Sequence, residues 1–316
     1  MQVSLSVVLS AILFAISAAL PSAIKDEEIA RRLQILSRVK RVIGGNETNT
    51  GDWPWLVHLK GKVPTGSSFW GFFTRSYKYH YCGGALIGPR LVLTAAHCFD
   101  GNDKTKTPKY WHVKAGDAEA HTHFYDRPKS WFGRLFGRGD WITYTSHAKE
   151  IRFHPEYNPG ALWQYDAAII VTEETFPVED ASVPQIAALK MPPADAESDW
   201  PADGQLCVVK GWGCTSDGAP TVDAAKAVVL PKVPDSTCRR IYGGGTTARF
   251  CAGYTNKNTG ICSGDSGGPL VCMYDGDWAH AGIASFSASG ASGDHPAAFT
   301  RITEIMPFIK DYTGKK

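Results

Sequence analysis

Residues 264–269 read GDSGGP, which places one serine among three glycines and ends the run with a proline. Glycine has no Cβ, so a backbone rich in it can turn sharply and can approach a bound molecule closely. Such a turn would expose the hydroxyl of Ser266 and leave main-chain amides beside it. A tight structural turn has the same composition, so the meaning of this stretch depends on the rest of the chain.

Two further segments carry side chains that can activate a serine hydroxyl. Residues 94–98 read TAAHC and hold His97 after a strand-like run, and residues 165–170 read YDAAII and hold Asp166 at the start of an apolar strand. A buried carboxylate needs a partner such as an imidazole. Acyl transfer to water needs a hydroxyl, a base that takes its proton, a group that orients the base, and donors for the developing oxyanion. The three segments together contain a candidate for each of these groups.

In the order His97, Asp166 and Ser266, these segments resemble the chymotrypsin-like (trypsin-fold) serine peptidases, and the resemblance runs from Val42 to about Lys310. The resemblance implies an all-β fold of two six-stranded antiparallel β-barrels packed together with a short C-terminal helix. It also implies a serine endopeptidase that hydrolyses peptide bonds through an acyl-enzyme intermediate. We therefore expect protein or peptide substrates, and neither a cofactor nor a metal.

The resemblance assigns roles residue by residue. Ser266 would be the nucleophile, His97 the general base and then acid, and Asp166 the group that orients the imidazole. The main-chain amides of Gly264 and Ser266 would form the oxyanion hole, and Ser285 would support the buried carboxylate. The alternative is a catalytically silent homologue that acts as a binding module. Such proteins usually lack a catalytic residue, whereas all three are present here.

The pattern along the chain favours an all-β fold. A chain of 316 residues, with 43% hydrophobic and 20% charged side chains, can bury a large core. Runs rich in Val, Ile, Leu and Tyr alternate with Gly, Pro, Asp and Asn clusters at residues 55–60, 84–87, 92–94, 208–210 and 281–285. A helix is predicted only over 303–310, where Ile305, Phe308 and Ile309 can share a face.

The N-terminal region is typical of a signal peptide. Residues 1–23 carry no Lys, Arg, Asp or Glu, and an apolar run ends in small residues around 17–19. We predict a signal peptide over 1–19, with cleavage as late as residue 23, and therefore a secreted, extracellular protein. A membrane anchor is the alternative, but the run is shorter than the roughly 20 residues that a bilayer span needs. Asn46, in the sequence Asn-Glu-Thr, is a candidate glycosylation site of a secreted chain.

Residues 20–41 are interpreted as an activation propeptide that precedes a peptidase domain over 42–316. Its end reads RVKR and is followed by VIGG at 42–45, which resembles the family's activation site. Cleavage after Arg41 would free the α-amino group of Val42 to pair with Asp265. The paired basic pattern suits a proprotein convertase as well as a trypsin-like activator. No cysteine precedes Cys82, so the propeptide would be released after cleavage.

Nothing in the net charge of the main domain argues for nucleic acid, and we expect neither a nucleic-acid nor a membrane partner. Residues 25–41 hold six basic and three acidic side chains, so they contribute +3 to a chain whose net charge is +2, and the remainder carries −1. The partners that we expect are substrates, an activating peptidase and macromolecular peptidase inhibitors. A metalloenzyme is a poorer interpretation, because no His-Glu-x-x-His spacing occurs.

Eight cysteines lie between residues 82 and 272, and an even count in a secreted chain suggests disulfides. The resemblance implies three pairs, which are Cys82 with Cys98, Cys207 with Cys272, and Cys238 with Cys251. The usual partner of Cys262 would lie in 286–298, where this chain has no cysteine. We propose that Cys214 takes its place. Two free thiols are the alternative.

The resemblance places the floor of the specificity pocket six residues before Ser266, at Gly260. The pocket therefore lacks a carboxylate that would pair with a substrate Arg or Lys. Further substrate-binding residues would be Ile261, Ser263, Ser287 and Ala297. We expect cleavage after apolar residues, in a chymotrypsin-like or elastase-like manner. Basic specificity would return if Asp294 bent into the pocket.

Two aromatic stretches, residues 61–81 and 121–147, are predicted to be surface loops inserted in this scaffold. The first holds seven Phe, Trp and Tyr residues, and the second mixes aromatic with basic side chains. A contiguous exposed aromatic surface often marks a binding site. The alternative is that these rings pack on one another and hold the loops down.

Overall fold

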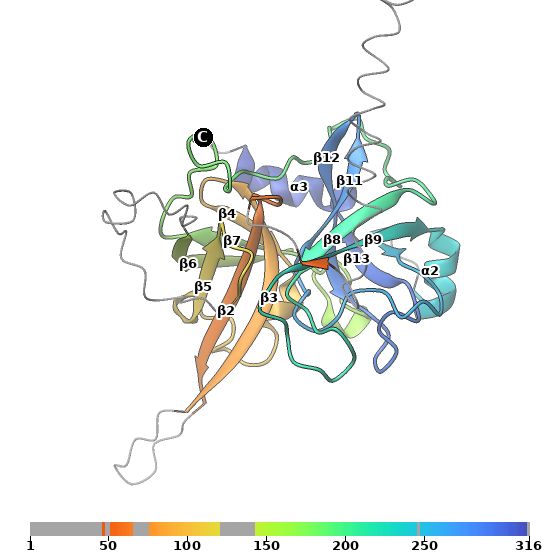
Figure 1. Cartoon of the computed structure of the whole chain (residues 1–316), viewed down its shortest axis with the longest axis horizontal. Coiled ribbons are helices and arrows are strands. Elements are labelled where there is room, and N and C mark those ends of the chain that lie inside the picture. Colours follow the sequence, from red (N-terminus) through yellow and green to blue (C-terminus); the bar gives the residue numbers. More distant parts are fainter. Residues whose placement is uncertain (1–45, 48–50, 66–75, 121–142, 245–246, 315–316) are drawn as a thin grey trace, which may run out of the picture.

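The computed structural model describes residues 46–47, 51–65, 76–120, 143–244 and 247–314, with the side chains of 46–47 excluded. The predicted signal peptide, the propeptide, Val42, the side chain of Asn46 and most of the second aromatic stretch lie outside these residues. Two β-barrels stand side by side in Figure 1, the first in orange to yellow-green and the second in green to blue. None of the described helices is long and apolar enough to cross a bilayer.

The first barrel closes in the order β2-β3-β4-β7-β6-β5. Side chains alternate between the two faces of a strand. In β2, Val57 and Leu59 face the core and are fully buried, whereas Lys60, on the opposite face, is half-buried. Its strands are β2 (Leu56–Pro64), β3 (Tyr77–Gly88), β4 (Leu91–Thr94), β5 (Trp111–Ala115), β6 (Tyr144–Phe153) and β7 (Ala168–Thr172).

The second barrel follows the order β9-β10-β13-β12-β11-β8 and closes through pairing of β8 with β9. The short strand β1 (Asn46–Glu47) adds to β9 outside this ring. The barrel's strands are β8 (Leu206–Gly211), β9 (Lys226–Val233), β10 (Arg249–Ala252), β11 (Pro269–Tyr274), β12 (Asp277–Phe286) and β13 (Ala297–Arg301). The predicted pair of six-stranded antiparallel barrels is therefore confirmed.

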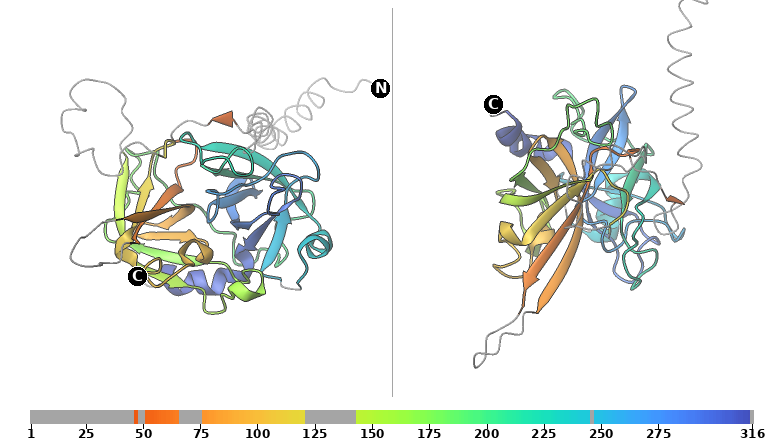
Figure 2. Two further views of the ribbon diagram at one scale, coloured as in Figure 1. Left: turned by 90° about the horizontal axis from the view of Figure 1, so that it is seen from below. Right: turned by 60° about the vertical axis from the view of Figure 1, so that its left-hand side comes forward.

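The predicted C-terminal helix is present as α3 (Ile302–Thr313), slightly longer than expected. The buried face of α3 joins the hydrophobic core of the first barrel, so the last described element packs against that barrel (Figure 2). The residues of this face are Ile302, Ile305, Phe308 and Ile309. A second helix, α2 (Asp235–Tyr242), was not predicted. It is too short for a clear apolar period, and the disulfide of its one buried residue, Cys238, anchors it to β10.

The prediction of a loop over residues 61–81 is wrong at both ends. Lys62–Pro64 continues β2 and Tyr77–Tyr81 begins β3, so the two strands form a ribbon that projects beyond the barrel (Figures 1 and 2). Tyrosine favours extended backbone, and alternate residues here face opposite sides. The aromatic content that suggested an insertion is therefore partly strand pattern.

All eight cysteines are described and none is free. The disulfides are Cys82–Cys98, Cys207–Cys272, Cys214–Cys262 and Cys238–Cys251, the four pairs expected from the sequence. The unusual pair, Cys214–Cys262, joins the segment before the GDSGGP turn to the chain that follows β8. The structure therefore does not support two free thiols.

Candidate active site

His97 and Asp166 come from neighbouring strands of the first barrel. His97 lies in a short 3₁₀ turn, Ala96–Phe99, just after β4, and Asp166 lies just before β7. These strands run antiparallel with Thr94 opposite Ala168, so the end of one meets the start of the other. His97 Nδ1 and Asp166 Oδ2 are 2.6 Å apart, and the main-chain N–H of His97 donates to Asp166 Oδ1 at 2.9 Å.

The carboxylate of Asp166 is fully buried, and the second barrel completes its hydrogen bonds. Ser285 Oγ, near the end of β12, donates to Asp166 Oδ2 at 2.6 Å. Thr300 Oγ1, in β13, donates to the main-chain oxygen of Asp166 at 3.0 Å. A buried carboxylate without such donors would be strongly destabilising. The two barrels thus share the task of keeping this group in place.

The imidazole of His97 is 19% exposed, so it lies at the edge of solvent. Burial alone would lower the pKa of His97, but the charge of Asp166 and the hydrogen bond with it outweigh burial and raise that pKa above its ordinary value. The pair therefore favours the protonated imidazole. A base that must hold a proton during a reaction benefits from such a partner.

The turn that carries Ser266 is pressed against the first barrel. The main-chain N–H of Gly83, in β3, donates to the oxygen of Ser266 at 2.7 Å, and Thr94 Oγ1 donates to the oxygen of Gly83 at 2.8 Å. A Cβ on Gly83 would lie 2.9 Å from Cα of Gly268, so only glycine allows this approach. The Cys82–Cys98 disulfide ties β3 to the turn of His97 as well, so one strand positions both segments.

Gly264 adopts a left-handed backbone, with φ of +102°. A Cβ at this position would lie 2.7 Å from Cγ2 of Thr221 and 3.2 Å from Cα of Gly213. Nearby, Cys214 N donates to the oxygen of Ser263 at 3.0 Å, beside the Cys214–Cys262 disulfide. Both conformation and space therefore require glycine where the family places an oxyanion-hole amide.

Asp265 points away from His97 into the interior. Its Oδ1 accepts from the N–H of Gly213 at 2.8 Å, and its Oδ2 accepts from the N–H of Cys262 at 3.0 Å. A Cβ on Gly211 or Gly213 would come within 2.2 Å of this carboxylate. Burial raises the pKa of Asp265 to about 6, although the two N–H donors act in the opposite direction. The site thus holds a buried carboxylate that a cation would stabilise.

Three of the residues predicted to line the pocket, Gly260, Ile261 and Ala297, are buried. The chain at Gly293 closes on Gly260, because a Cβ on Gly260 would lie 3.2 Å from Cα of Gly293, and Thr259 N donates to the oxygen of Gly293 at 3.0 Å. These contacts leave an apolar floor with little room for a longer side chain at position 260.

The remaining residues predicted to bind substrate are more exposed. Ser287 is half-buried, with its Oγ 3.0 Å from Oγ of Ser292, and Ser263 is exposed. Asp294 is exposed as well, and its main-chain oxygen accepts from Asn256 N at 3.0 Å.

Sequence reasoning missed Trp163. Its ring centroid lies 6.1 Å from that of His97 and 5.5 Å from that of Phe286, and its side chain is 37% exposed. Leu162 and Trp163 both have positive φ, 53° and 50°, and this turn brings the ring toward the histidine. The one available signal was an apolar pair in a loop just before Asp166, which is too common to indicate a site.

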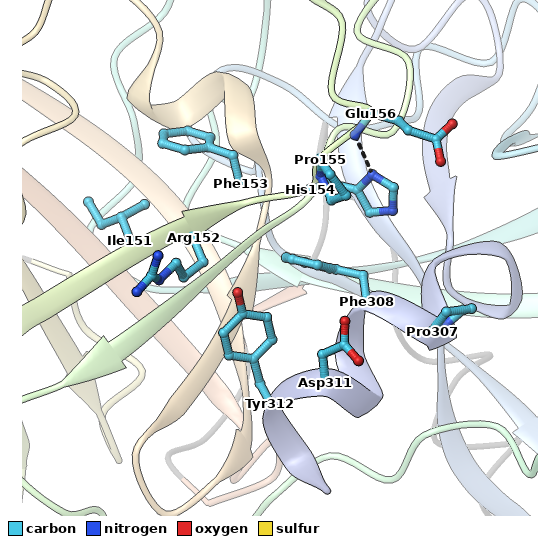
Figure 3. A pocket seen from close by; sticks show the side chains of 10 residues that line it. All are labelled: Ile151, Arg152, Phe153, His154, Pro155, Glu156, Pro307, Phe308, Asp311 and Tyr312. Atoms are coloured by element: carbon cyan, nitrogen blue, oxygen red, sulfur yellow. Dashed lines mark hydrogen bonds between the residues drawn. The ribbon is translucent and has the colours of Figure 1, made fainter. Parts of the chain in front are cut away.

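A cavity lies elsewhere in the described residues. It has a volume of about 590 Å³ and lies between the end of β6 and α3 (Figure 3). His154 lies in its wall, with its Nδ1 accepting from Glu156 N at 3.2 Å and its ring stacked on Tyr165 at 4.6 Å. None of His97, Asp166 and Ser266 lines this cavity.

The described geometry can be compared with known families. The family model described as Trypsin matches residues 42–309, which is most of the chain and includes both barrels and most of α3. The match begins at Val42, the residue that follows the predicted activation site. The chain therefore belongs to the trypsin family of serine peptidases.

Proposed function

We propose that this protein is a secreted serine endopeptidase, made as a precursor, that cleaves after apolar residues. The observation that carries the proposal is the contact of His97 Nδ1 with the buried, fully hydrogen-bonded Asp166 beside the Ser266 turn. Activation of the Ser266 hydroxyl by itself accounts for the contact of His97 with Asp166, and no second role is needed. The family match supports the coarser activity, peptide-bond hydrolysis by a serine.

In the proposed reaction, Ser266 Oγ attacks the carbonyl carbon of the scissile bond and gives its proton to Nε2 of His97. Asp166 holds the proton of Nδ1 and stabilises the imidazolium that forms. The N–H groups of Gly264 and Ser266 receive the oxyanion, and a single donor of this kind is typically worth about 3 to 4 kcal/mol. The imidazolium then protonates the departing amine, and water repeats the sequence to release the acid and Ser266.

The pocket supports a preference for apolar residues before the scissile bond. Gly260 offers no charge, and Ile261 and Ala297 add apolar surface. Burying an unpaired substrate cation there would be costly. A missing methylene changes transition-state binding by only about 1 to 3 kcal/mol, so we expect a broad rather than a narrow preference.

A peptide library varied at the residue before the scissile bond tests both reaction and pocket. The protein cleaved after Arg41 should cut after Leu, Val, Ala, Met or Phe at rates at least about 100-fold above those after Arg or Lys, because a buried unpaired cation is strongly disfavoured. Ser266→Ala is the blank. A fluorophosphonate probe should label the unsubstituted protein only. Absence of labelling would favour the silent homologue, and cleavage after Arg or Lys would contradict the apolar pocket.

Asp265 supports the activation step. Its buried carboxylate has no basic side chain among its described hydrogen-bond partners. An α-amino group on Val42 would supply the missing cation only after the bond following Arg41 is cut. Such a pair acts as a switch, because the charge does not exist beforehand. The new ion pair would stabilise Asp265 in this position and, with it, Gly264, its chain neighbour.

Arg41→Ala should give a stable precursor that resists activation and hydrolyses the best library peptide at least about 100-fold more slowly, since loss of an ordered oxyanion donor alone has that effect. To check this, the unsubstituted protein and Arg41→Ala are each treated with trypsin and then compared by mass spectrometry and an activity assay. Lys40→Ala is the matched control and should activate normally. Full activity of intact Arg41→Ala protein would contradict the proposal.

The stability of the precursor and that of the cleaved protein should depend differently on pH. The folded pKa of Asp265, about 6, is above its ordinary value of 3.8, so the folded precursor binds this proton more tightly than the unfolded chain does. The contribution of Asp265 to the free energy of unfolding of the precursor therefore falls by about 2 kcal/mol as the pH rises from 4 to 7. Cleavage after Arg41 should offset this loss of stability, because the α-amino group of Val42 would pair with the ionised Asp265. Urea unfolding of both forms should show a difference at pH 7 that shrinks toward pH 4.

A further inference from the structure

The ribbon of β2 and β3 presents one continuous polar and aromatic face. In their register, Lys60 lies opposite Tyr81 and Lys62 opposite Tyr79, with Pro64 opposite Tyr77. Because side chains alternate along a strand, these residues all project to the same side. Gly61 and Val63 face the other way, and Val63 is only 2% exposed. We call Lys60, Lys62, Tyr77 and Tyr79 the ribbon face.

The tyrosines of the ribbon face are exposed. Tyr77 and Tyr79 are 39% and 46% exposed, and they are among the few large hydrophobic side chains at the surface of the described residues. The ammonium of Lys60 is 5.3 Å from the ring centroid of Tyr79, and that of Lys62 is 4.6 Å from that of Tyr77. Each lysine is thereby held over a ring on the same side of the ribbon. Rings arranged in this way form a rigid surface that a partner can bind with little loss of side-chain entropy.

The ribbon face is also cationic. It carries Lys60 and Lys62, whereas Lys78 projects to the other side, and the sequences of β2 and β3 contain no Asp or Glu. Burial, followed by the charge of Lys62, lowers the pKa of Lys60. Burial and then the neighbouring His147 and ribbon lysines lower the pKa of His112, across from Lys60 in β5, to about 4. Mutual repulsion of this kind marks a positive potential, which would favour an anionic partner.

The edge of β3 leads from this face to the candidate active site. Gly83 N donates to the oxygen of Ser266, so Gly83 turns its main-chain groups away from β2. By the alternation of an antiparallel pair, Tyr79 and Tyr77 turn theirs the same way. Among the described residues, β3 pairs with β4 only from Ala85 onward, so the stretch 77–80 has β2 as its one strand partner. An extended peptide could pair with that edge and run toward Ser266.

We propose that the ribbon face and the adjoining edge of β3 bind an extended acidic segment of the protein substrate. The inference rests on the proposed function and adds a substrate class to it. Alternate residues of an extended peptide are about 7 Å apart, the spacing of the ribbon side chains along each strand. Its carboxylates would meet the lysines, and its main chain would pair with β3. A sulfated polysaccharide would satisfy the charge but has no extended peptide main chain that could pair with the edge.

The binding test uses the full-length chain carrying Ser266→Ala, which does not depend on cleavage, and a fluorescein-labelled decaglutamate peptide followed by fluorescence anisotropy. Lys62→Glu in this background should weaken binding about tenfold, because a cation is replaced by an anion at the contact. Tyr79→Ser leaves the charge unchanged and removes an exposed ring, and it should weaken binding about fivefold. Far-UV circular dichroism checks that each variant is folded.

The matched control is Lys310→Glu, which makes the same charge change on an exposed position of α3, away from the ribbon. It should leave binding within about twofold, since distant surface charges are screened by salt. A decaglutamate peptide N-methylated at every residue keeps every charge but cannot donate to the edge, and it should bind about fivefold more weakly. Equal binding by all variants would overturn the proposal. So would tighter, Lys62-dependent binding of a heparin octasaccharide.

An activity assay separates this inference from the proposed function. In the cleaved protein, Lys62→Glu should leave kcat/KM for a short tripeptide amide unchanged. A second substrate has the same sequence extended by an acidic tail on either side of the scissile bond. For this substrate, Lys62→Glu should raise KM about tenfold and leave kcat unchanged. No hydrolysis of the short amide would refute the proposed function while the anisotropy result still stood. Equal KM values for the two substrates would refute the inference alone.

Discussion

Asp166→Asn should lower kcat by about 10⁴-fold, a magnitude that follows other members of the trypsin family, with the fold intact. The main-chain N–H of His97 requires an oxygen at the Oδ1 position, so the amide NH₂ would occupy the Oδ2 position and face His97 Nδ1. Nδ1 would then become the acceptor and its proton would move to Nε2. In that tautomer, the imidazole cannot take the proton of Ser266. Steady-state kinetics on the best library peptide measures the loss.

The pH profile provides a second measure of the same variant. The charge of Asp166 raises the pKa of His97 against the opposing effect of burial. Without the carboxylate, burial remains, so the acid limb of kcat/KM should move to lower pH. Asp100→Asn is the control, because Asp100 raises the same pKa by its charge but accepts its hydrogen bond from Tyr157. It should cost less than about tenfold in kcat, since its charge acts without direct contact. Equal losses in the two variants would contradict the orienting role.

Gly264→Ala should lower kcat/KM by about 10²- to 10³-fold, the loss typical of one missing oxyanion donor. The new Cβ would lie 2.7 Å from Cγ2 of Thr221, and alanine disfavours a φ of +102°. The chain must therefore shift and move the amide. Kinetics with the best library peptide measures the loss, and retention of full activity would show that the amide of residue 264 does not contact the oxyanion.

Two further variants separate the clash from backbone strain. Gly276 has a similar positive φ of +84° but nothing within 4 Å of its Cβ position, in the turn between β11 and β12. Gly276→Ala should therefore cost about 1 to 3 kcal/mol of stability with no change in kcat/KM. Adding Thr221→Ser to Gly264→Ala removes the clashing methyl and should restore part of the activity. No rescue would assign the loss to strain alone.

Much of the fold was predictable because its evidence is local. The segments around His97, Asp166 and Ser266 each combine a functional side chain with neighbours that dictate a strand end or a glycine turn. The pair Cys214–Cys262 followed from the absence of any other partner. The helix α2 and the strand character of residues 61–64 and 77–81 were missed. A short helix anchored by one disulfide has no period to read, and an aromatic strand has the composition of an aromatic loop.

The sequence by itself determined which residue types this protein brings to its site, since the three motifs, the glycines and the cysteines are short-range patterns with few interpretations. Only the tertiary structure decided how residues far apart in the chain meet. The contact of Trp163 with His97 and Phe286, and the donation from Gly83 to Ser266, join different strands and loops. So does the alignment of lysines and tyrosines on the ribbon face. These depend on barrel closure and strand register, which are set by packing summed over the whole chain, so no local stretch carries them.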